Sequence, residues 1–113
     1  MTVHEVSELV NGQIVVNHDA SRQVSFAFAS DLMSDVLTLM EDDVMLITGL
    51  ATVQALRTAL MSDIDTILIV RGKKITTEMI EIAKSHELSL IQSAYSMFRA
   101  SGILYQNGLK AVF

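Results

Sequence analysis

Residues 44–70, VMLITGLATVQALRTALMSDIDTILIV, decide the fold of this 113-residue chain. The stretch begins with an apolar run at residues 44–48 and ends with a second one at residues 66–70. Between the two runs, apolar side chains recur at the spacing of one helix face: Val53, Leu56 and Leu60. Both runs have strand length and are apolar on both faces, which is typical of parallel strands covered by helices on each side. The stretch therefore predicts a strand–helix–strand unit.

The same alternation of strands and helices extends outward to both ends of the chain. Thr2 and Glu5 form a capping box, which predicts a first helix over residues 2–11. The predicted strands cover residues 13–16, 23–29, 44–48, 66–70 and 88–92, and residues 109–113 form an extended tail. We expect one domain over residues 1–113, a three-layer α/β/α arrangement around a mainly parallel sheet of about five strands. The first two strands are expected to add a mixed or antiparallel edge.

Composition narrows the classes of function. The chain has no cysteine, which excludes disulfides, zinc–thiolate sites, iron–sulfur clusters and thiol nucleophiles. A formal net charge of −5 argues against nucleic acid, whose phosphates are bound by Lys and Arg. The chain lacks a signal-peptide pattern, and its apolar runs are far shorter than the roughly 20 residues of a membrane span. We expect a cytoplasmic protein that binds neither nucleic acid nor membranes.

In parallel α/β sheets, ligands bind beyond the carboxyl ends of the strands. Six small or polar residues fall there and form the predicted ligand crevice: Ser30, Asp31, Thr48, Gly49, Arg71 and Gly72. Residues 71–74, Arg-Gly-Lys-Lys, are the densest positive charge of the chain, and Thr76 or Thr77 is expected to cap the next helix. Cations beside a helix start can hold a phosphate or carboxylate, and a solvated turn is the alternative interpretation.

Ser30 and Asp31 also begin a short predicted helix, whose apolar stripe consists of Leu32, Met33, Val36, Leu37 and Met40. Ser and Asp favour N-cap positions, so helix capping is one role for this pair. Asp31 and Asp35 stand four residues apart on one helix face, and two such carboxylates can also hold Mg²⁺. The three histidines are scattered, and no phosphate-binding or nucleophile motif is present, so we expect no resident metal or cofactor.

Residues 30–37, SDLMSDVL, resemble the S-D-L-L-S-D-V-[LM] segment of the DRTGG domain family. The resemblance continues through residues 43–48, DVMLIT, which are similar to the family's G-D-[LV]-[WI]-[IL]-T stretch. It also includes residues 67–72, ILIVRG, although Val70-Arg71-Gly72 stands where the family has T-G-G. In all, the resemblance covers residues 10–108.

This family is similar to the N-terminal domain of HPr kinase/phosphorylase, and related copies accompany cystathionine-β-synthase-type regulatory domains. The resemblance implies the fold of that N-terminal domain and an accessory role in regulation and self-association, without catalysis of its own. Our leading hypothesis is a non-catalytic sensor module, a homodimer that binds a small anionic metabolite or a metabolic enzyme. The alternatives are a pure interaction domain without a ligand and a magnesium-dependent enzyme that uses residues 30–35.

Overall fold

Helices and strands alternate along the whole chain in the computed structural model, which describes residues 1–113. The helices are α1 (Val3–Leu9), α2 (Met33–Val36), α3 (Val53–Met61), α4 (Thr77–Ser85) and α5 (Met97–Gln106). The strands are β1 (Gln13–Val16), β2 (Phe26–Ala29), β3 (Val44–Thr48), β4 (Thr66–Ile69), β5 (Ser89–Gln92) and β6 (Lys110–Ala111). The predicted α/β class is confirmed.

The six strands form one sheet in the order β1-β5-β4-β3-β2-β6. All neighbouring pairs are parallel except β1 and β5, which are antiparallel. The predicted mainly parallel sheet is therefore confirmed, with six strands instead of about five because the extended tail contributes β6 beside β2. The antiparallel edge consists of β1 alone, since β2 pairs in parallel with β3.

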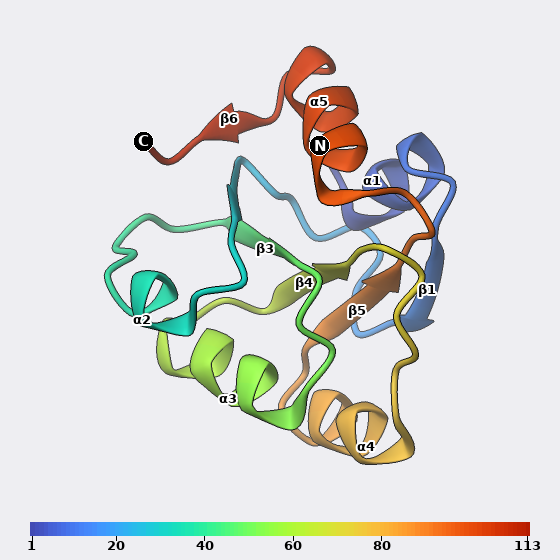
Figure 1. Ribbon diagram of the computed structural model, residues 1–113, viewed down its shortest axis with the longest axis vertical. Coiled ribbons are helices and arrows are strands. Elements are labelled where there is room, and N and C mark those ends of the chain that lie inside the picture. The colour runs from blue at the N-terminus through green and yellow to red at the C-terminus, as the bar shows by residue number, and fades with distance from the viewer.

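The helices cover both faces of the sheet, as Figure 1 shows: α1 and α5 lie on one side, and α2, α3 and α4 lie on the other. Every residue of β3 and β4 is buried. Successive side chains of a strand point to opposite faces. Met45 and Ile47 accordingly pack in the core under α1 and α5, while Leu46 packs in the core under α3 and α4. Two cores on one strand explain why its sequence is apolar without alternation.

The predicted strand over residues 23–29 enters the main sheet only at Phe26. Gln23 instead pairs with Thr2 in an isolated antiparallel bridge, because the start of α1 lies beside it. The capping box that predicted this helix is present, with Glu5 N–H donating to Thr2 Oγ1 over 3.1 Å. The local prediction was therefore right for the helix and three residues too long for the strand.

The second helix is much shorter than its predicted apolar stripe. Three residues of that stripe are exposed, by 58%, 51% and 93%: Leu32, Leu37 and Met40. Thr38 ends the helix, because its N–H and its Oγ1 both donate to the carbonyl of Asp35, over 3.1 Å and 2.7 Å. The chain leaves helical geometry before the last two apolar residues could reach the core, so that part of the prediction was wrong.

None of the helices combines the length and the apolar character needed to cross a lipid bilayer.

Candidate functional site

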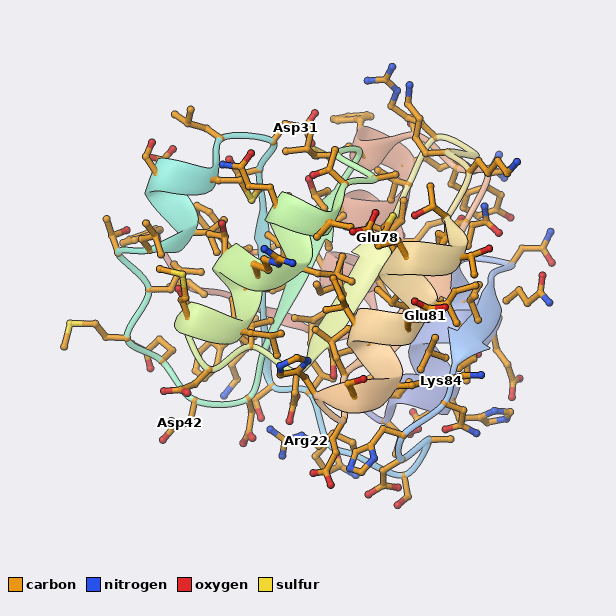
Figure 2. The ribbon with its side chains drawn as sticks, turned by 90° about the horizontal axis from the view of Figure 1, so that it is seen from below. Arg22, Asp31, Asp42, Glu78, Glu81 and Lys84 are labelled. Atoms are coloured by element: carbon orange, nitrogen blue, oxygen red, sulfur yellow. The ribbon has the colours of Figure 1, made fainter.

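Asp31 lies at the carboxyl edge, the edge of the sheet where β2, β3, β4 and β5 end (Figure 2). Its Oδ1 accepts hydrogen bonds from Thr48 Oγ1 at 2.8 Å and from the N–H of Gly49 at 2.7 Å. Thr48 Oγ1 in turn accepts from the N–H of Leu50 at 3.1 Å. The segment after β2 is thereby fastened to the loop after β3, and the buried hydroxyl of Thr48 has both a donor and an acceptor partner.

The capping role considered for Ser30 and Asp31 was wrong. The N-cap of α2 is Leu32, and no side chain caps it. Ser30 Oγ accepts from the N–H of Leu32 at 2.9 Å, which forms a local turn ahead of the helix. The Asp31 carboxylate is directed to the neighbouring strand because β2 and β3 lie side by side in the sheet.

The loop after β4 adopts a left-handed backbone at two successive residues, with φ of 66° at Arg71 and 64° at Gly72. The N–H of Arg71 donates to the carbonyl of Tyr95 at 2.8 Å, and the N–H of Gly72 donates to the carbonyl of Ser93 at 3.0 Å. These bonds fasten the loop after β4 to the loop after β5. A left-handed conformation costs an L-residue such as Arg roughly 1 kcal/mol, so the fold holds this arginine against its own preference.

Gly49 lies between the acidic and the basic residue of the predicted crevice. A Cβ atom at this position would lie 3.6 Å from both carboxylate oxygens of Asp31 and 3.6 Å from Cδ of Arg71. The structure thus brings Asp31, Thr48, Gly49 and Arg71 together, with Ser30 next in the chain. Gly72 lies farther along the edge, toward Ala94 and Ser93.

Four of the eight Lys and Arg residues gather along this edge: Arg71, Lys73, Lys74 and Arg99. All four are exposed, and none forms an ion pair with a carboxylate. The guanidinium of Arg99 lies 3.8 Å from the ring centroid of Tyr95, a cation–π contact that holds it near the loop of Arg71. The edge therefore carries positive charge that the protein itself leaves unneutralised.

Three helices begin at the carboxyl edge, and each is capped by a hydroxyl side chain. Thr52, Thr76 and Ser96 accept from the third N–H of α3, α4 and α5 respectively, each over 3.1–3.2 Å. The prediction that Thr76 or Thr77 caps the helix after the basic loop is confirmed for Thr76. The positive ends of these helix dipoles face the same side as the four cations.

Arg99 was missed by the sequence analysis. It occupies the first turn of α5, where its N–H donates to Ser96 Oγ. A signal was present: Ser96 is a typical N-cap residue shortly after a predicted strand, and a helix that follows a parallel strand begins at the carboxyl edge.

At the amino edge, where β3 and β4 begin, an arginine is paired with carboxylates. There Arg22 contacts Asp43 Oδ1 through Nη1 at 3.2 Å and Asp65 through Nε at 3.0 Å. Partial burial lowers the pKa of Arg22, but the hydrogen bond and the charge of Asp65, together with those of Asp43, outweigh it and raise the pKa above its ordinary value. Arg22 is therefore a structural cation whose charge is already neutralised.

Two cavities lie away from the predicted crevice. One lies between α5, β2 and residues 109–113, and another lies between α3 and α4. None of the six predicted crevice residues lines either cavity. No group of three or more His, Asp or Glu side chains is arranged to hold a metal ion.

The sequence model of the DRTGG domain family matches residues 5–106 of this chain. The chain belongs to the DRTGG domain family. The resemblance carried by residues 30–37 is thereby confirmed. No protein of curated function matches this DRTGG domain.

Among solved structures, this DRTGG domain is similar to the CBS and DRTGG domains of the regulatory region of Clostridium perfringens pyrophosphatase, complexed with the activator diadenosine tetraphosphate. The TM-score is 0.72 at 11% sequence identity, over 96% of this chain and 47% of that chain. The likeness establishes the fold, and this chain spans about half the length of that structure.

Proposed function

We propose that this DRTGG domain is a non-catalytic regulatory module of the cytoplasm that binds a small anionic ligand at the carboxyl edge of its sheet. The proposed site consists of the six residues of the crevice, Ser30, Asp31, Thr48, Gly49, Arg71 and Gly72, and the cations beside them supply the charge that binds the ligand. A metabolic partner enzyme would then respond to the liganded state, which requires that the ligand bind two states of the module with different affinity.

The observation that carries the proposal is the group of unpaired cations. Arg71, Lys73, Lys74 and Arg99 lie along one edge of a protein whose net charge is −5, and none has a carboxylate partner. Charge-assisted hydrogen bonds to Arg and Lys are about twice as strong as neutral ones, which favours phosphate and carboxylate ligands. Asp31 has a positioning role in this scheme, because its Oδ1 is occupied by Thr48 and Gly49.

The structural neighbour supports the class of ligand. The regulatory region of the pyrophosphatase was solved with diadenosine tetraphosphate, which carries a chain of phosphates. A polyphosphate suits an edge that presents several cations along two adjacent loops. We therefore place phosphorylated metabolites and nucleotides first among the ligands to be tested.

The test is ligand-induced thermal stabilisation with inorganic tripolyphosphate and with diadenosine tetraphosphate. A ligand that binds only the folded state raises the melting temperature with concentration. We expect Arg71→Ala to weaken binding roughly ten- to a hundredfold, because a charge-assisted contact contributes about 1.5–3 kcal/mol. Arg57→Ala is the matched control, since Arg57 is an exposed arginine of α3 that lacks a carboxylate partner. A wild type that neither ligand stabilises, or an equal loss in both variants, would contradict the proposal.

We also propose that the module is a homodimer. Seven large apolar side chains are exposed, and three of them fall within residues 32–40: Leu32, Leu37 and Met40. An exposed apolar surface of this kind is typical of association sites. Light scattering at micromolar concentration should give twice the monomer mass of 12.4 kDa, and Met40→Ser should shift it toward the monomer. A strict monomer would remove the dimer and leave the ligand-binding proposal intact, while a dimer that binds no anion would favour the pure interaction domain.

A further inference from the structure

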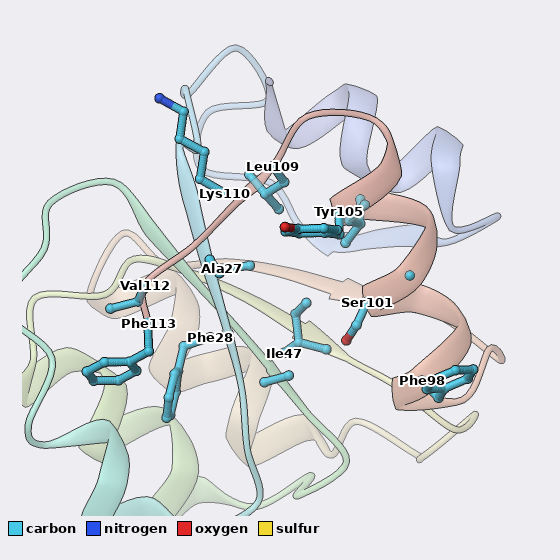
Figure 3. A pocket seen from close by; sticks show the side chains of 14 residues that line it. Ala27, Phe28, Ile47, Phe98, Ser101, Tyr105, Leu109, Lys110, Val112 and Phe113 are labelled. Atoms are coloured by element: carbon cyan, nitrogen blue, oxygen red, sulfur yellow. The ribbon is translucent and has the colours of Figure 1, made fainter.

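The cavity between α5, β2 and residues 109–113 is a groove on the face covered by α1 and α5, which we name the α5 groove (Figure 3). Its volume is about 440 Å³, and 11 of its 14 lining residues are hydrophobic. Its principal walls and floor come from α5, β2, β3 and the last residues of the chain: Phe28, Ile47, Phe98, Ser101, Tyr105 and Phe113. Pockets for small molecules commonly measure roughly 300–1,000 Å³ and have mainly apolar walls, so size and lining both fit a ligand site.

One polar atom in this groove is left without a partner. Ser101 Oγ is the only buried side-chain oxygen or nitrogen of the protein that makes no hydrogen bond. In Figure 3 its hydroxyl points from α5 into the groove, toward Ile47. A buried hydroxyl without a partner is unfavourable, and native proteins leave few of them. A ligand with one carbonyl or hydroxyl group would supply the missing partner.

The next residue, Gly102, also lines the groove and has no structural reason to be glycine. It lies inside α5, its φ is not positive, and a Cβ atom built on it would meet nothing within 4 Å. Glycine in a helix interior is less favourable than alanine by about a factor of five in the folding equilibrium. The backbone of α5 is thus left bare beside the unpartnered hydroxyl, which lets an occupant approach closely.

We propose that the α5 groove binds a small neutral molecule with a mainly apolar body and one carbonyl or hydroxyl group, which forms a hydrogen bond with Ser101 Oγ. The ligand is neutral because the groove offers no charge to pair with it. Lys110 is the only charged residue in the lining, and its amine points away from the cavity in Figure 3. A buried charge without a partner would be costly. No residue of this site belongs to the crevice of the proposed function, so either site can fail without the other.

The probe for this site is 6-propionyl-2-(dimethylamino)naphthalene, a neutral fluorophore with one ketone whose emission shifts to the blue when it leaves water. We expect saturable binding with a blue shift. Gly102→Leu fills the groove and should weaken binding at least tenfold. Ser101→Ala removes the hydroxyl and should weaken it roughly three- to tenfold, as expected for a neutral hydrogen bond. The analogue 2-(dimethylamino)naphthalene lacks the ketone, so Ser101→Ala should leave its affinity unchanged.

Two controls separate the groove from general stickiness and from unfolding. Met61→Ser removes an apolar side chain that is 72% exposed on α3, across the sheet, and should leave probe binding unchanged. Gly102→Ala adds only a methyl group and should raise the melting temperature, which shows that substitution at this position does not damage α5. The proposal is overturned if the wild type does not bind the probe or if Gly102→Leu binds it as well as the wild type. A dimer that Gly102→Leu converts to a monomer would overturn it too, since the groove would then hold a second copy of the chain.

Discussion

At the amino edge of the sheet one arginine, Arg22, contacts two aspartates, whereas at the carboxyl edge four cations contact no carboxylate. The one acid of the predicted crevice, Asp31, is bound to the neutral donors of Thr48 and Gly49 instead of to Arg71. Figure 2 shows Asp31 and Arg22 at opposite ends of the molecule. The same residue types therefore stabilise the fold at one edge and are left free at the other. Charge that the fold has already paired is structural, and charge that it leaves unpaired is available to a ligand.

The largest expected effect concerns the acid of the carboxyl edge. Asp31→Ala removes the acceptor of two hydrogen bonds, and the buried hydroxyl of Thr48 then has no acceptor for its proton. We therefore expect the free energy of unfolding to fall by about 2 kcal/mol. Urea denaturation measures this change. The matched control is Asp35→Ala, because Asp35 is an exposed acid of the same segment whose carboxylate makes no hydrogen bond. Equal losses in the two variants would mean that Asp31 does not fasten the edge.

We expect a smaller loss of stability from a substitution at the amino edge. Arg22→Ala leaves Asp43 and Asp65 without their cation, which should lower the free energy of unfolding by about 1 kcal/mol. The value is modest because 36% of the arginine side chain is exposed, and solvent screens the pair. Arg57→Ala should change stability by less than about 0.5 kcal/mol, since Arg57 has no carboxylate partner. If both arginines prove equally dispensable, the distinction between paired and unpaired charge does not hold.

The smallest expected change in stability is an increase. Arg71→Gly should stabilise the protein by about 0.5 kcal/mol, because glycine accepts the positive φ while losing more chain entropy on folding. The same variant should lose affinity for tripolyphosphate, so its stability would rise while its binding weakens. Gly72→Ala is the converse control, since its φ of 64° makes any side chain there unfavourable. A destabilised Arg71→Gly would show that the arginine serves the fold.

The central strands could be predicted because burial on both faces leaves a signature in one segment. Residues 44–48 and 66–70 are apolar without alternation, and the structure buries β3 and β4 completely. The signal for the first helix was equally local, since Thr2 and Glu5 contact each other within one helical turn. Predictions of this kind depend only on residues close together in the chain.

The contacts of the site depend on strand order, which no local pattern contains. Asp31 reaches Thr48 because β2 lies next to β3, and the local pattern alone favoured a helix cap. Arg99 joins the cations because β5 lies next to β4 and its loop meets that of Arg71. The α5 groove was beyond prediction for the same reason. Its lining combines residues of β2, β3, α5 and the end of the chain, which are far apart in the sequence.

The antiparallel strand β1 also has a consequence for the order in which the protein folds during synthesis. Its residue Ile14 pairs with Ile91, so β1 leaves the ribosome long before its only strand partner, β5, has been made. Strands β2, β3, β4 and β5 emerge in the order in which they pair, and each can dock on the one before it. Contacts between distant segments form late because closing a long loop costs entropy. We expect the first segment of the chain to wait with its apolar side uncovered and to join the sheet only after β5 is in place.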